Sequence, residues 1–360
     1  MTSFLDYAAK GTQVFLSSMK GRLVSPNIPG NAEEICREVV KRCWNGRYFQ
    51  TSTMNFPEFW ARDFGWCTQS LMKLGYQKEV QQTLRYALNR YKKYHTITTT
   101  ISPRGRPFDV FQPAIDSLPW LINSIKMSKF PYGAFKPFLN QQIRIFFEKY
   151  IDPKTGLVKA DAEASSIKDF AVRKSSCYSN CMVALLAKRL SETRFYNPFS
   201  RYDYPTIIKR HFWNGRYFYD DLDKKNYVAG DANLFPFALG IIGDKEMMAS
   251  AIQQVQESTL DLPFPLKYTS SREGVKFTWQ ELFFKDYESN AIWTHMGLLY
   301  IKLVGHLDQV KAGGYKEEYK ILIEKCKGFP EVLTSRGKPY QSLVYYSDMS
   351  MLWACNYLTL

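Results

Sequence analysis

The chain has 360 residues and carries 48 Lys and Arg against 34 Asp and Glu, which gives a formal net charge of +14. A surplus of this size suits nucleic acid or an anionic membrane surface, but the basic residues are interleaved with Glu, so we expect neither partner. The N-terminal apolar stretch contains Asp6 and Lys10 and has no cleavage pattern, so we expect neither a signal peptide nor a membrane span.

Apolar residues recur at helical spacing along most of the chain. A first helix is expected over 4–19, within an N-terminal extension that covers 1–30. Twelve further helices are expected at 31–43, 62–75, 77–94, 112–127, 134–150, 173–191, 201–212, 231–242, 244–257, 287–305, 314–327 and 341–358. No stretch shows sustained strand alternation and no linker divides 31–360, which we therefore expect to form a single domain.

The connections between these twelve helices alternate in length. Those after the odd-numbered helices of the set span roughly 13 to 29 residues and those after the even-numbered ones roughly 1 to 9, against a common loop length of ~4–6. Charge alternates in the same phase, because odd-numbered helices such as 31–43 and 314–327 are rich in charged residues and even-numbered ones are poor in them. Together these alternations predict an all-α (α/α)6 toroid with charged outer helices and apolar inner ones.

The charges of the inner helices are predicted to gather at one end of the ring, because all inner helices start at the face that carries the long loops. The charged residues in or beside their first turns are Arg62, Asp63, Asp116, Arg173, Lys174, Asp231 and Glu288. A closed ring leaves a funnel at that face, where we expect a functional site. The repeated sequence at 44–49 and 213–218 contains Asn-Gly, which favours a tight turn, and we interpret it as structural.

Two carboxyl groups on one face can hydrolyse a glycosidic bond, one as an acid and the other as a base or nucleophile. Asp116 lies at the start of a buried segment beside Pro119 and Trp120, and an apolar wall there would raise its pKa, as an acid catalyst requires. An Asp at this position is equally typical of a helix N-cap.

The second carboxylate is sought on the last long loop. Glu331 lies there between Pro330 and Val332, an unusual place for a surface charge. The simple alternative is that Glu331 is an exposed loop residue. Glu288 and Glu281 are then the other candidates for the base.

Several motifs resemble those of one enzyme family. The segment Asp116-Ser-Leu-Pro-Trp120 resembles the Asp-Ala-x-x-Trp motif in the glucosidase region of glycogen debranching enzymes and their relatives. Phe329-Pro-Glu331 resembles their Phe-Pro-Glu motif, and Trp60-Ala-Arg62-Asp63 is similar to their Trp-x-Arg-Asp. The resemblance implies an (α/α)6 toroid and an inverting amylo-α-1,6-glucosidase, with Asp116 as general acid and Glu331 as general base.

Two further segments extend the resemblance over about 40–360. Gly230-Asp-Ala-Asn-Leu234 is similar to a loop-to-helix motif of related toroid hydrolases, and Tyr287-Glu-Ser-Asn-Ala-Ile-Trp293-Thr-His295 is similar to their Tyr-His-x-Gly-x-x-Trp-Pro-His stretch. The chain departs from the second pattern at Glu288 and Thr294. We expect no β-domain of the type that often precedes such toroids to fit before residue 31.

The motifs supply the candidate sugar-binding residues. Arg62 and Asp63 suit sugar hydroxyls, and the alternative is that the pair only fixes the first inner helix. Asp231 can equally be a helix cap, Trp120 and Trp293 can equally be core, and His295 can equally be a buried, hydrogen-bonded histidine. The full set of candidates is Trp60, Arg62, Asp63, Trp66, Trp120, Asp231, Asn233, Tyr287, Trp293 and His295.

The leading hypothesis is an inverting, exo-acting α-glucosidase that acts on α-glucosides or oligosaccharides. A sugar epimerase on the same ring would take a proton from carbon with a His or Tyr base, but of the four histidines only His295 lies at the start of an inner helix. A third hypothesis is a catalytically silent toroid that binds carbohydrate.

No metal or organic cofactor is expected, because the chain has no Gly-rich phosphate loop and no acids at metal-ligand spacing. The seven cysteines form an odd set without a CxxC pair or a histidine at zinc spacing. We interpret them as reduced core thiols in a cytoplasmic protein.

Overall fold

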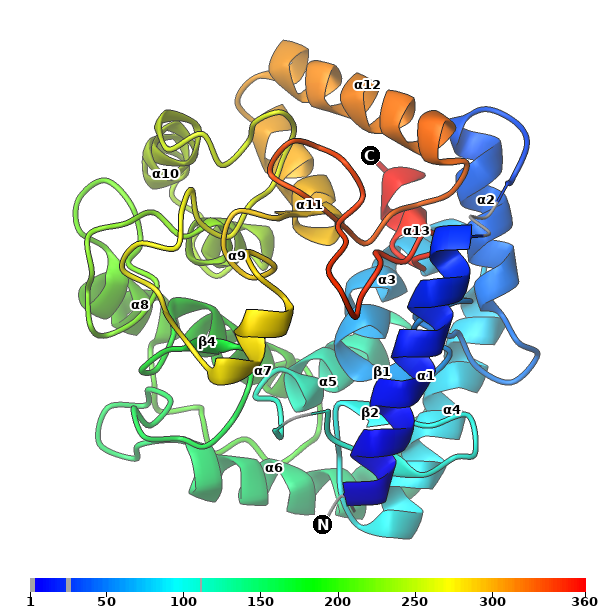
Figure 1. Cartoon of the computed structure of the whole chain (residues 1–360). Coiled ribbons are helices and arrows are strands. Elements are labelled where there is room, and N and C mark those ends of the chain that lie inside the picture. The colour runs from blue at the N-terminus through cyan, green and yellow to red at the C-terminus, as the bar shows by residue number, and fades with distance from the viewer. Residues whose placement is uncertain (1–3, 24–26, 111) are drawn as a thin grey trace.

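A computed structural model describes residues 4–23, 27–110 and 112–360 and shows a two-layer ring of helices (Figure 1). The outer helices are α2 (Ala32–Cys43), α4 (Gln77–Tyr94), α6 (Lys136–Tyr150), α8 (Tyr204–Phe212), α10 (Lys245–Glu257) and α12 (Gln309–Cys326). The inner helices are α3 (Ala61–Lys73), α5 (Ser117–Met127), α7 (Cys177–Ser191), α9 (Gly230–Ala238), α11 (Thr294–Gly305) and α13 (Ala354–Tyr357).

The inner helices form a closed ring. Contacts run from α3 through α5, α7, α9 and α11 to α13, and α13 packs back against α3. The outer helices α4, α8, α10 and α12 pack against α3, α7, α9 and α11, and α2 packs against α13. This arrangement confirms the predicted (α/α)6 toroid.

The two layers differ in how much of each helix is buried. The outer helix α2 buries Ile35, Val39 and Cys43 on one face, and its N-terminus is closed by a capping box between Asn31 and Glu34. The inner helix α9 is buried along 230–237, so it meets other elements on all sides. The alternation of charge in the sequence therefore reports the layer to which each helix belongs.

The last inner helix is much shorter than predicted. The sequence predicts a helix over 341–358, but only Ala354–Tyr357 is helical, and residues before it form a loop. The buried carboxylate of Asp348 accepts hydrogen bonds from the backbone N–H of Asn55 at 2.6 Å and of Ser350 at 2.7 Å. Such side-chain to backbone bonds stabilise a non-helical path, because they compete with the bonds of a helix.

Short strands tie the long loops together. β1 (Phe59–Trp60), β2 (Thr100–Ile101) and β3 (Pro107–Phe108) form an antiparallel sheet, β4 (Ala171–Val172) pairs with β5 (Lys276–Phe277), and β6 (Ile292–Trp293) pairs with β7 (Val332–Leu333). In these pairs Trp60 lies opposite Thr100, and Trp293 lies opposite Val332. Strands of two residues are too short to produce alternation in the sequence, which is why they were not predicted.

The two repeated segments form tight turns, as predicted. Trp44 forms an antiparallel bridge with Phe49, and Trp213 forms the same bridge with Phe218. The glycine of each Asn-Gly pair has a positive φ, 84° at position 46 and 100° at position 215. Glycine adopts this left-handed region without steric cost.

The helix α1 (Phe4–Leu23) crosses the face of the ring that carries the long loops and is drawn in dark blue in Figure 1. The Lys10 Nζ atom lies 2.8 Å from a carboxylate oxygen of Glu58, and Arg22 donates a hydrogen bond to the Tyr345 carbonyl at 3.2 Å. The predicted helix over 4–19 is therefore present. No helix in the described part of the chain is long and apolar enough to cross a membrane.

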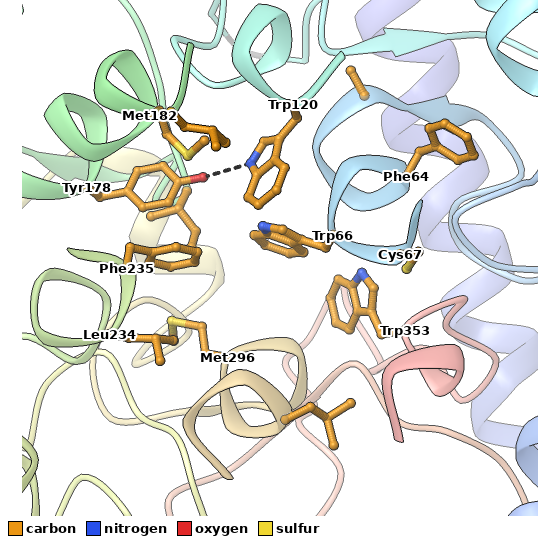
Figure 2. Close-up of a cluster of buried hydrophobic side chains, with 14 of the residues drawn as sticks. Phe64, Trp66, Cys67, Trp120, Tyr178, Met182, Leu234, Phe235, Met296 and Trp353 are labelled. Carbon is orange, nitrogen blue, oxygen red and sulfur yellow. Dashed lines mark hydrogen bonds between the residues drawn. The ribbon is translucent and has the colours of Figure 1, made fainter. Parts of the chain in front are cut away.

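Aromatic side chains fill the centre of the ring (Figure 2). The ring centroid of Trp66 lies 6.1 Å from that of Trp120 and 5.9 Å from that of Trp353. Tyr178 packs edge-on against Phe235 at 4.7 Å. Rings at these distances and angles pack favourably, so the toroid has a solid aromatic centre at the base of its loop face.

Candidate active site

A cavity of about 90 Å³ opens into the ring and has Trp66 and Trp353 of the aromatic centre in its wall. The predicted site residues that line it are Trp60, Arg62, Asp63, Trp66, Tyr287, Trp293, His295 and Glu331, together with the reserve candidate Glu288. They come from the loops and first turns around α3, α11 and α13. Most of the predicted site is thus brought together in one place.

Glu331 is buried, not exposed, and its carboxylate faces this cavity with fixed partners. One oxygen accepts a hydrogen bond from the Tyr287 hydroxyl at 2.8 Å. The other accepts from the Tyr345 hydroxyl and from the backbone N–H of Asp348. Burial raises the pKa of Glu331 from 4.5 to about 7, and the Asp348 carboxylate adds to this effect, while the three donors oppose it.

Asp116 does not reach the cavity, which corrects its predicted position. Its carboxylate is fully buried and accepts hydrogen bonds from Arg62 Nε at 2.6 Å and from the Tyr178 hydroxyl at 2.8 Å. Asp116 occupies the N-cap position of α5, as the alternative has it, but its side chain makes no capping hydrogen bond. Asp116 lies behind Arg62 and fixes the guanidinium, because a paired charge is held more firmly than a free one.

Asp169, which no sequence motif singles out, lines the cavity instead. It lies on the long loop before α7 and keeps part of its surface exposed. Burial raises its pKa from 3.8 to about 6; the nearby Arg62 lowers the pKa, and the Asp116 carboxylate raises it again. A carboxyl group with a neutral-range pKa in a cavity is the typical environment of a catalytic acid or base.

The two other candidates for the base have structural partners. The Glu288 carboxylate accepts hydrogen bonds from the backbone N–H groups of 169–171, at 2.5, 2.7 and 2.9 Å, and so holds the loop that carries Asp169. Burial and the Asp169 carboxylate raise the pKa of Glu288 to about 8. Glu281 is paired with Arg272 and accepts from the backbone N–H of Asp286. Glu288 lines the cavity, but both of its carboxylate oxygens are occupied by these N–H groups, and Glu281 does not line the cavity.

The cavity wall holds ring nitrogens without a hydrogen-bond partner. Among the described residues these are the indole N–H groups of Trp60 and Trp66 and both nitrogens of His295, all of them buried. His295 stacks on Trp66 with ring centroids 4.0 Å apart. Burial lowers its pKa well below 6.5, so the imidazole is neutral and has one donor and one acceptor. Buried polar atoms without a partner are rare, and a bound polyhydroxyl ligand would satisfy them.

Asp63 completes this wall. It is buried, accepts a hydrogen bond from the Trp353 indole N–H at 2.9 Å, and lines the cavity. Burial raises its pKa to about 7, while the adjacent Arg62 lowers it. Asp63 and Arg62 therefore present a buried acceptor and a buried donor group side by side, which is the arrangement that sugar hydroxyls require.

Three other predicted binding residues have structural roles in the described part of the chain. Asp231 pairs with Arg173 at 2.8 Å and with Lys168 at 3.1 Å, inside a buried charge cluster away from the cavity. The Asn233 amide donates to the carbonyl oxygens of Phe218 and Ala229. Trp120 packs against Trp66 in the aromatic centre, which agrees with the alternative that it is a core residue. The structure therefore places these three residues outside the candidate sugar-binding cavity.

Among the described residues, no group of His, Cys, Asp and Glu side chains is arranged to hold a metal ion.

Similarity to known proteins is found for the three-dimensional structure and not for the sequence. No protein-family model matches the sequence, and no curated protein matches it. A rhamnosidase from Klebsiella oxytoca with rhamnose bound has a TM-score of 0.61 and 11% identity over 92% of this chain, which spans 64% of that protein's length. A GH63 mannosylglycerate hydrolase from Thermus thermophilus, in complex with Tris and D-glycerate, has a TM-score of 0.62 and 10% identity over 91% of this chain and 100% of that one.

A glycosidase variant in complex with glucose is also similar, with a TM-score of 0.64 and 10% identity over 91% of this chain and 94% of the other. The chain therefore has the (α/α)6 fold of the six-hairpin glycosidases. Identities of 10–11% show the fold alone. The specific likeness to glycogen debranching enzymes stays a prediction.

Proposed function

We propose that this chain is an inverting glycoside hydrolase that removes a terminal sugar, with Asp169 as general acid and Glu331 as general base. The observation that carries the proposal is the cavity itself, in which buried ring nitrogens without partners lie beside four carboxyl groups whose pKa values burial raises to between about 6 and about 8. Of these four, Asp63 is bonded to the Trp353 indole and Glu288 to backbone N–H groups, which leaves Asp169 and Glu331 for the chemistry. Glu331 keeps the role that the sequence predicts. Asp169 takes the role predicted for Asp116.

The ring topology supports two separate carboxyl groups. Asp169 lies on the loop before α7 and Glu331 on the loop before α13, and these inner helices are three steps apart around the closed ring. Loops this far apart in the ring can bring two carboxyl groups to one bound sugar from different directions. Inversion needs carboxyl groups ~6.5–9.5 Å apart, with the acid at the leaving oxygen and the base at a water on the other face of the sugar.

The roles follow from how each carboxyl group is exposed. Asp169 still has surface open to solvent, so a bound sugar removes water from it and raises its pKa further, which favours the protonated acid. Glu331 is already buried and changes less on binding. Its hydrogen bonds from Tyr287, Tyr345 and the Asp348 N–H favour the ionised form that a base requires.

We further propose a glucoside with an α linkage as the substrate, as the motif resemblance implies. Three solved structures of similar fold are complexes with rhamnose, with glucose, or with Tris and D-glycerate. The test panel therefore contains α- and β-linked glucosides, rhamnosides and mannosides. Proton NMR of the reaction mixture identifies the anomer that is released first, and the opposite anomer to that of the substrate is expected. Retention of configuration, or a bound sugar that is never cleaved, would contradict the proposal.

A further inference from the structure

A second, larger cavity of about 510 Å³ lies beside the cavity that holds Glu331. The two cavities share Phe56, Trp60, Asp169 and Tyr287 as lining residues, so they adjoin at Asp169. We call them the inner cavity, with Glu331, and the outer cavity. A volume of this size is typical of pockets that bind a small molecule of drug size.

The outer cavity is apolar. The residues with carbon-only side chains that line it and not the inner cavity are Val14, Phe15, Phe108, Val110, Phe284 and Val344. They come from α1, from β3 and the loop after it, from the loop after the 3-10 helix Trp279–Phe283, and from the loop before α13. In Figure 1 these are the dark blue helix, the cyan loop, the yellow turn and the red loop on the face turned to the viewer.

Two polar groups that line the outer cavity and not the inner one, those of Lys10 and Tyr345, already have partners. Lys10 donates to Glu58 at 2.8 Å and to the Asn55 carbonyl at 2.8 Å, so its charge is neutralised. The Tyr345 hydroxyl donates to Glu331. A second sugar in this cavity would leave most of its hydroxyls without partners, which is costly in a dry site, whereas an apolar group would bury its surface at a gain.

We propose that the outer cavity binds an apolar aglycone, so that the substrates are glycosides of hydrophobic alcohols. This inference rests on the proposed function, because the acid must lie at the bond that breaks. Asp169 gives its proton to the glycosidic oxygen as the bond from that oxygen to the anomeric carbon breaks. Water attacks the anomeric carbon and its proton passes to Glu331. The sugar then remains in the inner cavity and the alcohol in the outer one.

The test compares substrates that differ in the length of the aglycone but not in the acidity of the alcohol that is released. Methyl, butyl and hexyl α-D-glucosides, below micelle-forming concentrations, release alcohols of similar acidity, so differences in kcat/KM report binding of the chain. Each buried methylene is expected to raise kcat/KM two- to fourfold, which gives at least about thirtyfold from methyl to hexyl. 2-Phenylethyl α-D-glucoside distinguishes a ring-type aglycone from a lipid-type chain, and either preference supports an apolar site.

Two adjacent residues of α1 supply matched variants. Phe15 lines the outer cavity with 41% of its surface exposed, and Leu16 is 61% exposed and does not line it. Phe15→Ser should lower kcat/KM for the hexyl glucoside about fivefold and leave the methyl glucoside unchanged. Leu16→Ser should change neither, which excludes a general effect on the helix.

The outcomes separate the two proposals. Cleavage of maltose or methyl α-D-glucoside as fast as of the hexyl glucoside would overturn the apolar aglycone and leave the hydrolase intact. If no glycoside is cleaved, the proposed function fails, and calorimetric affinities of Glu331→Gln for hexyl and methyl α-D-glucoside still test the outer cavity. Tighter binding of the hexyl compound, reduced by Phe15→Ser, would support it, and equal affinities would overturn it.

Discussion

Arg62 lies between two aspartates that the chain uses differently. Its guanidinium is held by Asp116, with the Nε atom 2.6 Å from a carboxylate oxygen, and its charge also lowers the pKa of Asp169. Because the charge of Arg62 is largely neutralised by Asp116, Asp169 keeps a pKa of about 6 and can be protonated near neutral pH. Asp116 is thus a positioning residue for the acid.

This division of roles predicts different kinetics for two variants. Asp169→Asn should lower kcat for an alkyl glycoside by about 10²–10⁴-fold, because the alkoxide leaves without a proton, and should lower it much less for a 2,4-dinitrophenyl glycoside. Asp116→Asn should lower both rates by a similar factor, since it displaces Arg62. It should also shift the alkaline limb of the pH–rate profile downward, because the freed guanidinium lowers the pKa of Asp169.

Steady-state kinetics with both substrates across pH 4–9 check this prediction. The result that would contradict it is a loss in Asp116→Asn that disappears with the dinitrophenyl leaving group, because that pattern belongs to the acid itself. A circular dichroism spectrum like that of the parent protein serves as the folding control for each variant.

The sequence led to Glu331 and not to Asp169 for a physical reason. Glu331 lies between Pro330 and Val332 just before an inner helix, a local signal that a single segment contains. Asp169 lies within an irregular loop, and it is held there by Glu288, which is 119 residues away in the sequence. The sequence around Asp169 does contain one similar signal, because the apolar residues Ile167 and Phe170 lie within two positions of it. Both of these residues are buried in the structure.

At the scale of elements, the loop before α13 is held by one buried carboxylate. Asp348 is fully buried and accepts hydrogen bonds from Ser52 Oγ at 2.5 Å, from the backbone N–H of Asn55 and from both donors of Ser350. The same loop carries Tyr345, which donates to Glu331. This network therefore joins the first and last long loops of the ring beside the base.

We predict that Asp348→Ala lowers the free energy of unfolding by about 3–5 kcal/mol, because it leaves several buried donors without an acceptor. Asp348→Asn keeps one acceptor oxygen and should lose about half as much. Urea unfolding followed by tryptophan fluorescence measures both values. Equal midpoints for Asp348→Ala and the parent protein would show that the network does not stabilise the ring.

The elements that the sequence predicted correctly are those stabilised by a repeating pattern. Helices such as α4 and α12 have charged and apolar faces over many turns, and their loops alternate in length around the ring. The short strands and the loop at 341–353 depend instead on partners far along the chain, such as the bridge between Ser52 and Met351. No local periodicity encodes such partners, so a helix was predicted where Asp348 holds a loop.

At the scale of the whole molecule, the packing of the ring offsets the cost of burying ionisable groups in the site. The pKa values of Glu331, Asp63 and Asp169 are raised to about 7, about 7 and about 6, which means that folding disfavours their ionised forms. The large aromatic centre and the closed ring of helices offset this cost. Functional sites commonly carry such a cost, since activity needs groups in unfavourable environments.

The cost can be measured at Glu331. Between pH 4.5 and 7 the folded protein binds more protons at this residue than the unfolded chain, so stability falls as pH rises through that window and the loss is complete above it. At 1.36 kcal/mol for each pH unit, the full effect is up to about 3 kcal/mol. Glu331→Gln removes this pH-dependent term and keeps the shape of the side chain.

We therefore predict that Glu331→Gln unfolds at a higher denaturant concentration than the parent protein at pH 8.5, by about 1–3 kcal/mol in free energy, and that the advantage vanishes at pH 4. Urea unfolding at the two pH values gives the four free energies required. Glu273→Gln, which removes an exposed loop carboxyl group, is the matched control for the change in net charge. A variant less stable than the parent at pH 8.5 would mean that the hydrogen bonds from Tyr287 and Tyr345 outweigh the burial of the charge, and that Glu331 is ionised well below pH 7.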